Sequence, residues 1–111
     1  MGARVKWTPT TRTIGFLEAR GWIVDIAERQ QGPITRDLFG CIDLVAVHPD
    51  KRAVLFVQVT SRSNIASRIA KTLAQPTTRK LIQAGVLIEV WGWGDEAEPR
   101  IERLNTWDIQ A

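Results

Sequence analysis

The 111-residue sequence contains a single cysteine, no tyrosine and no long apolar run. Because Cys41 has no partner within the chain, neither an intramolecular disulfide scaffold nor a cysteine-rich zinc module is available. The longest uninterrupted apolar run, Ala53–Val57, has five residues, whereas a membrane-spanning helix needs about 20. The N-terminus also lacks the apolar core of a signal peptide. We therefore expect a cytoplasmic protein that is not inserted in a membrane.

Acidic residues are absent from one third of the chain. Between Lys51 and Ile88 there are seven basic residues and no Asp or Glu, whereas the rest of the chain carries eight basic and twelve acidic residues. This asymmetry predicts a positive field over part of the surface, for which nucleic acids are the usual partners. The alternative is a solvated basic face that has no partner. The seven basic residues are Lys51, Arg52, Arg62, Arg68, Lys71, Arg79 and Lys80.

The chain reads as one domain over residues 1–111, because no repeat, low-complexity tract or linker interrupts it. The near-continuous apolar stretch Ala53–Val59 indicates a central strand with both faces covered by helices. The segment from Ile34 to Gly40 is ambiguous. The order α-β-β-β-α-α-β predicts an α/β fold, a single mixed β-sheet flanked by helices. The expected elements are a helix from the threonines at 8–13 to Gly21, strands at 22–27, 41–48 and 53–60, a helix capped by Ser61 or Ser63, a short helix capped by Thr77 or Thr78, a strand at 86–91, and an edge strand or short terminal element at 100–108. Pro76 stops the first of the two later helices or starts the next turn.

The turn between the strands at 41–48 and 53–60 predicts their register. If the turn is centred between Asp50 and Lys51, opposed residue numbers sum to 101 and Asp43 faces Gln58. Opposed side chains point to the same side of a sheet, so Asp43, Gln58 and Thr60 are expected on one face. A carboxylate among apolar neighbours is costly to bury without a partner or a cation. Asp43 is therefore the best single candidate for a functional residue.

Each candidate also has an ordinary structural interpretation. Asp43 can cap a backbone turn or pair with an arginine such as Arg36. Gln58 and Thr60 can simply end a strand, with Gln58 hydrogen-bonded to Asp43 or to nearby backbone. Glu18, on or beside the buried side of the first helix, can be a solvent-facing or salt-bridged residue. The residues alone leave both interpretations open.

The ordered set of motifs resembles a known family. Residues 40–46, Gly-Cys-Ile-Asp-Leu-Val-Ala, followed after ten residues by Val-Gln-Val-Thr-Ser at 57–61, are similar to the core of the PD-(D/E)XK nuclease superfamily. The likeness is to Holliday-junction-resolvase-like and small phage or restriction-type members. It extends over most of the chain, because the helix with Glu18, the Asp43 hairpin, the following helix and the 81–91 segment stand in that superfamily's order. The resemblance implies a restriction-endonuclease-like core.

The resemblance also implies roles for individual residues. Asp43 falls on the family's metal-binding aspartate, Gln58 on its second acidic position and Thr60 on its lysine. Glu18 falls on the first-helix glutamate of resolvase-like members, and the backbone carbonyl of Val59 would be a further metal ligand. The implied cofactor is Mg²⁺ or Mn²⁺, and the implied reaction is metal-dependent hydrolysis of a phosphodiester in DNA.

Two departures from the family pattern change the chemistry. Gln58 can still offer a carbonyl oxygen, but it is neutral, so the affinity for a metal should fall. Thr60 cannot supply the positive charge of the lysine that it replaces. That charge could come instead from Arg62, Arg68 or Lys71 on the following helix.

The sequence therefore supports competing functions. A nuclease would hold a cation at Asp43, Gln58 and Glu18, which requires Glu18 to lie near Asp43. A catalytically inactive DNA-binding or assembly module would keep the fold and the basic face, and a partner-binding domain would not need nucleic acid. The DNA that such a protein binds could be branched. Trp93 is expected to pack in the core or to form a homodimer contact. The expected DNA-binding residues are Arg62, Arg68, Lys71, Arg79 and Lys80.

Overall fold

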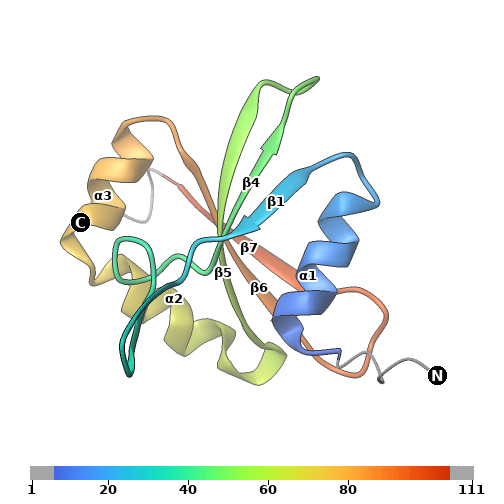
Figure 1. Cartoon of the computed structure of the whole chain (residues 1–111), viewed down its shortest axis with the longest axis horizontal. Helices are drawn as coiled ribbons and strands as arrows, with labels where there is room; N and C mark the ends of the chain where they lie inside the picture. Colours follow the sequence, from blue (N-terminus) through green and yellow to red (C-terminus); the bar gives the residue numbers. More distant parts are fainter. Residues whose placement is uncertain (1–6, 106–111) are drawn as a thin grey trace.

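The computed structural model describes residues 7–105 and has an α/β fold, in which one mixed sheet lies between helices. The strand order of this five-stranded sheet is β1-β4-β5-β6-β7, and β5 and β6 run parallel. Helix α1 lies on one side of the sheet, and α2 and α3 lie on the other (Figure 1). The elements are α1 (Pro9–Glu18), β1 (Ile23–Ile26), β2 (Arg29–Gln31), β3 (Ile34–Arg36), β4 (Leu44–His48), β5 (Ala53–Ser61), the 3-10 helix η1 (Arg62–Asn64), α2 (Ile65–Leu73), α3 (Pro76–Gln83), β6 (Leu87–Trp93) and β7 (Arg100–Leu104).

Strand β5 is central, as its apolar sequence predicts. Leu55 and Val57 are buried in a core that includes Leu17 of α1. Phe56, between them, packs in a second core with Ile82 of α3 on the opposite face of the sheet. Side chains alternate along a strand, so β5 contributes to both cores at once. The prediction that helices cover both faces of this strand is confirmed.

The predicted register of the β4–β5 hairpin is also confirmed. Val45 pairs with Phe56 and Val47 with Val54, and the ladder ends at Leu44 and Val57. The predicted start of the strand at Cys41 is wrong, because β4 begins three residues later. Residues 38–42 instead form a tight loop whose backbone turns back on itself, so they cannot extend the ladder.

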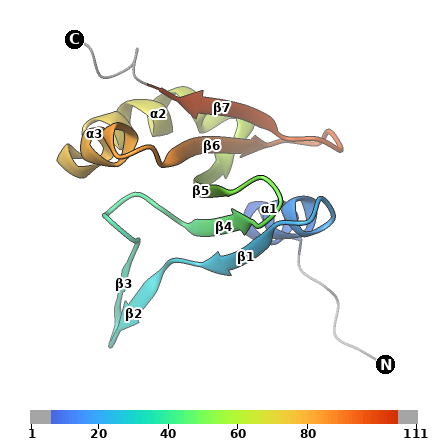
Figure 2. The ribbon, with the colours of Figure 1, turned by 90° about the horizontal axis from the view of Figure 1, so that it is seen from above.

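A second, two-stranded sheet lies before β4, and only its second strand falls in the ambiguous segment from Ile34 to Gly40. Arg29–Gln31 and Ile34–Arg36 pair as the antiparallel hairpin β2–β3, which projects away from the main sheet (Figure 2). The loop that follows contains two left-handed residues, Phe39 at φ 55° and Gly40 at φ 78°. Glycine is suited to this conformation, whereas a phenylalanine in it is unusual and strained.

The helices after β5 begin at other residues than predicted. Ser61 precedes the short helix η1, and α2 begins only at Ile65. Pro76 is at the first position of α3, so this helix begins before the predicted caps Thr77 and Thr78. Proline fits this position because the backbone nitrogen of the first helical residue has no hydrogen-bond partner within the helix. Thr78 is fully buried, and its hydroxyl donates to the carbonyl of Thr72 at 2.6 Å, which ties α3 to α2.

Two further predictions concern the last part of the chain. An edge strand is confirmed as β7, which pairs with β6; residues 106–108 of the predicted element lie outside the described residues. Trp93 is buried and its indole nitrogen donates to Thr13 at 2.7 Å, so it packs in the core as expected. Among residues 7–105, no helix is long and apolar enough to cross a membrane.

Candidate functional site

Two aspartates lie together at the start of β4. Leu38 and Ile42 form an isolated antiparallel bridge, and their backbones exchange hydrogen bonds of 3.2 and 2.9 Å with each other. The residues just outside such a bridge are opposed, which brings Asp37 to Asp43. The Asp37 side chain raises the pKa of Asp43 through its charge and through a side-chain hydrogen bond, which places the two carboxyl groups near each other. Sequence reasoning missed Asp37, although an aspartate on each side of a tight loop with Gly40 near its centre was a usable signal.

The backbone of β5 holds Asp43 in place. The N–H of Asp43 donates to the carbonyl of Val57 at 2.9 Å, and the N–H of Val59 donates to Oδ2 of Asp43 at 2.7 Å. In a strand, the N–H and the C=O of one residue point to the same side. The carbonyl of Val59 is therefore directed toward the same side as Asp43, past the point where β4 begins. The carboxyl oxygens of Asp43, from the loop before β4, and the carbonyl oxygen of Val59, from β5, are therefore on the same side.

The Asp43 carboxyl has an altered affinity for protons. The pKa of Asp43 is raised to about 6, chiefly by burial and in smaller part by the neighbouring Asp37. The hydrogen bond from Val59 and the positive charge of Arg68 act in the opposite direction. A carboxyl that resists ionisation so strongly is stabilised in its charged form by a cation, because a nearby positive charge offsets both burial and repulsion.

Gln58 and Arg68 form the side of the site that faces α2. Gln58 is buried, and with its amide oriented to satisfy both ends, the nitrogen donates to the Cys41 carbonyl and the oxygen accepts from Nη1 of Arg68 at 3.1 Å. The predicted pairing of Asp43 with Gln58 does not continue the ladder, because Asp43 precedes β4. Arg68 is the cation on α2 that acts on Asp43, one of the three residues that the sequence offered for this role.

Thr60 and Glu18 occupy different places. Thr60 is buried in β5 beside Gly92 of β6. Glu18 is exposed at the end of α1, which packs on the other face of the sheet. The carbonyl of Arg20, two residues later, contacts His48 at 3.1 Å, and His48 ends β4 whereas Asp43 precedes its start. The structure therefore does not bring Glu18 to Asp43, and Asp37 supplies the second carboxylate instead.

The basic residues expected to bind DNA do not form one group. Arg62 is directed to the β6–β7 loop, where its Nε is 3.4 Å from Oε2 of Glu96 and its Nη2 donates to the carbonyl of Glu98. Arg68 faces Gln58 and Asp43, as described above. Lys71, Arg79 and Lys80 are exposed on α2 and α3. Of these five, only Arg68 contacts the candidate site within the described residues.

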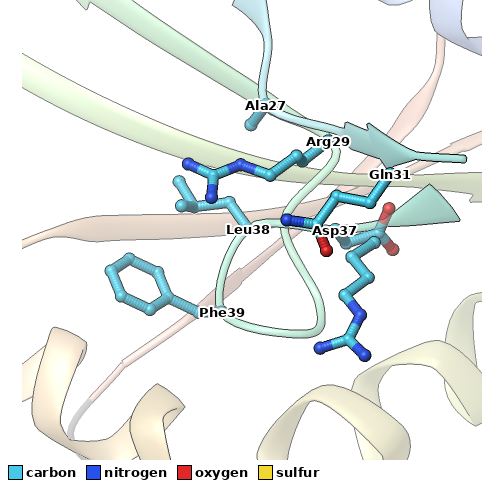
Figure 3. Close-up of a pocket in the computed structure, with 7 residues that line it drawn as sticks. Ala27, Arg29, Gln31, Asp37, Leu38 and Phe39 are labelled. Carbon is cyan, nitrogen blue, oxygen red and sulfur yellow. The ribbon is translucent and has the colours of Figure 1, made fainter. Parts of the chain in front are cut away.

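A pocket of about 300 Å³ opens beside Asp37. It lies between the β2–β3 hairpin and the loop at 37–43, and Figure 3 shows side chains from both segments around it. Asp37 forms part of its wall, so the pocket reaches the site. Its lining residues are Ala27, Arg29, Gln31, Arg36, Asp37, Leu38 and Phe39.

The donor set suits a small, hard cation. No group of three or more His, Cys, Asp or Glu side chains that could hold a metal occurs within residues 7–105. The site instead offers two carboxylates and the carbonyl of Val59, and Mg²⁺ is commonly held by one or two carboxylates while keeping several waters. The amide of Gln58 is engaged by Arg68 and Cys41, so it is not a free ligand. Burial raises the pKa of the Cys41 thiol, which makes a thiolate ligand or nucleophile unfavourable there.

Comparisons of the chain with protein-family models, with curated proteins and with solved structures gave no match.

Proposed function

We propose that this protein is a nuclease that hydrolyses phosphodiester bonds in DNA with Mg²⁺ or Mn²⁺, and that Asp37 and Asp43 are its metal-binding carboxylates. The observation that carries the proposal is the pairing of these two carboxyl groups beside Val59, with the positive charge of Arg68 acting on Asp43. Two adjacent carboxylates repel each other and one is partly desolvated, an arrangement that a divalent cation would stabilise.

The order of elements supports a restriction-endonuclease-like core as part of this proposal. A helix precedes an antiparallel strand and hairpin, and α2 and α3 then connect β5 to the parallel strand β6. The site residues come from the start of β4, from β5 and from α2, the segments in which the resemblance to PD-(D/E)XK nucleases lies. The substitution of Asp37 for the missing acidic side chain explains how a Gln could stand at position 58.

Each residue has a defined role in the proposed reaction. Asp37, Asp43 and the carbonyl of Val59 would hold the cation, which supplies charge stabilisation of the scissile phosphate and a lowered pKa for the attacking water. Arg68 would stabilise the negative charge that develops on the phosphate. Thr60, at the position of the family's lysine, carries no charge and could not do this. Gln58 positions the Arg68 guanidinium through its 3.1 Å contact.

One observation favours a second function. The Gln58 oxygen accepts from Arg68, so among residues 7–105 the site has one charged ligand pair and no third acidic side chain. A protein of this fold that binds DNA without cutting it would need no more than this. Cleavage assays separate the two functions directly.

The test is a cleavage assay on linear duplex, single-stranded and branched DNA with Mg²⁺, with Mn²⁺ and with EDTA. We expect metal-dependent products from the wild type and a loss of at least about 100-fold in Asp43→Asn, since the charged ligand is removed while the hydrogen bond from Val59 is kept. Identical purification of Asp43→Asn controls for a contaminating nuclease. No cleavage of any substrate by the folded wild type would leave the non-catalytic function.

A further inference from the structure

Two arginines are cross-strand partners in the projecting hairpin. Arg29 of β2 is directly opposite Arg36 of β3 in the antiparallel register, and both are exposed. Like charges at opposed positions destabilise a strand pair, and within the described residues neither side chain forms an ion pair with an acidic group. The two arginines therefore do not stabilise the hairpin, and their positive charges are available to bind an anion.

Both arginines also line the pocket that reaches Asp37. Figure 3 shows Arg29 and Gln31 of β2 extending over the same pocket whose wall Asp37, Leu38 and Phe39 form from the loop. A phosphate held by these arginines in the pocket would therefore lie on the side of the site that Asp37 forms.

Phe39 gives the same pocket an aromatic surface. Its ring stacks on Phe56 with a centroid separation of 6.1 Å and an interplanar angle of 20°, and 45% of the residue remains exposed. Its backbone is in the left-handed region at φ 55°, which is strained for a phenylalanine. Strain of this kind is tolerated where the position has a use. An exposed aromatic ring beside a phosphate site can stack on a nucleobase, provided that the base is unpaired.

We propose that the pocket between β2–β3 and the 37–43 loop binds an unpaired nucleotide of a DNA strand, with Arg29 and Arg36 on its phosphate and Phe39 on its base. This inference rests on the proposed function and names its substrate: DNA with a single-stranded segment beside the scissile bond. A fully paired duplex hides the base face that Phe39 needs, so it binds less tightly.

The test measures binding in EDTA, so that it does not depend on cleavage. Three fluorescent probes are compared by anisotropy: a 12-nucleotide thymidine strand, a strand of the same length made of abasic units, and a 12-base-pair duplex. We expect the wild type to bind the thymidine strand about tenfold more tightly than the other two. Phe39→Asn should bind the thymidine strand and the abasic strand equally, because asparagine accepts the left-handed backbone but cannot stack on a base.

Matched variants test the arginines. Arg29→Ala combined with Arg36→Ala should weaken binding of the thymidine and abasic strands about tenfold and reduce the salt dependence, because phosphate contacts are lost. The control is Lys51→Ala with Arg52→Gly, which removes two charges at the β4–β5 turn; Arg52 has φ 51°, so glycine fits there. Circular dichroism confirms that the variants are folded.

The outcomes separate this inference from the proposed function. Equal wild-type affinity for thymidine and abasic strands, absence of binding, or no effect of Phe39→Asn overturns the nucleotide pocket. An equal effect of the arginine pair and the control pair also overturns it. Intact, Phe39-dependent binding without cleavage in Mg²⁺ or Mn²⁺ overturns the nuclease alone, whereas cleavage without a preference for unpaired DNA overturns the pocket alone.

Discussion

Asp37 lies beside Asp43 because Leu38 pairs with Ile42 in the tight loop between them. The loop therefore converts two residues that are separated along the chain into a carboxyl pair at the start of a buried strand. This pair replaces the combination of Asp43 with Glu18 that the sequence suggested. It also gives the site a specific instability, since two carboxylates in contact cannot both ionise freely.

The first prediction concerns the stability of Asp43→Asn. The folded-state pKa of Asp43 is raised from 3.8 to about 6, so ionisation costs the folded wild type stability as the pH rises through this interval. The variant avoids that cost and should exceed the wild type by roughly 1–2 kcal/mol at pH 7.5, allowing for partial solvent screening. The difference should vanish near pH 4. Urea unfolding at both pH values measures it, and a variant less stable than the wild type at pH 7.5 would contradict the assignment.

The second prediction compares the two acidic residues that compete for the role of second ligand. Asp37→Asn should lower metal-dependent cleavage at least about 100-fold, because it removes one of two charged ligands. Glu18→Gln should leave cleavage within about twofold of the wild type, since Glu18 is exposed on α1 across the sheet. Initial rates on one DNA substrate at saturating Mg²⁺ give the comparison. The reverse ranking would show that Glu18, not Asp37, completes the site.

The third prediction concerns Arg68. Its positive charge lowers the pKa of Asp43, so Arg68→Ala should raise that pKa further. We expect cleavage to fall about 10- to 100-fold and the acidic limb of the pH–rate profile to move to higher pH. Lys71→Ala, an exposed position on the same helix, is the matched control and should leave the profile unshifted. Identical pH–rate profiles for wild type and Arg68→Ala would exclude the proposed effect of the Arg68 charge on Asp43.

The fourth prediction tests how β6 supports the segment that carries Arg68. A Cβ at Gly92 would overlap the side chain of Ile65 and lie 3.0 Å from Cα of Arg62, so η1 and α2 rest directly on this glycine. Gly92→Ala should destabilise the protein by about 2–3 kcal/mol through overpacking. Gly15→Ala in α1 meets no atom within 4 Å and should stabilise it by about 0.5–1 kcal/mol. Equal midpoints in urea for the two variants would be inconsistent with this packing.

The parts of the fold that follow strong local patterns could be predicted from the sequence. The turn at Asp50 and Lys51 gave the register of β4 and β5 correctly, and the apolar run at 53–59 identified the central strand. Such features depend on alternation and turn chemistry, which adjacent residues determine.

The parts that depend on unusual backbone or distant packing could not be predicted. Phe39 adopts a left-handed conformation that its residue type disfavours, so the shape of the loop that brings Asp37 to Asp43 could not be predicted, although Gly40 between two aspartates marked a turn there. Pro76 could equally end one helix or begin the next, and the burial of Thr78 against Thr72 decides for α3. The position of Glu18 depended on which face of the sheet α1 covers, and the order of elements did not specify this.

The most direct test of the account is a Mn²⁺ titration of the wild type followed by electron paramagnetic resonance of the free ion. The pairing of Asp37 with Asp43 predicts one Mn²⁺ bound per chain at pH 7.5, with affinity falling below about pH 6 as Asp43 takes up a proton. The variants Asp37→Asn and Asp43→Asn should each lose this binding, and Glu18→Gln should retain it. Absence of bound Mn²⁺ in the folded wild type, or equal binding by wild type and Asp43→Asn, would contradict the account.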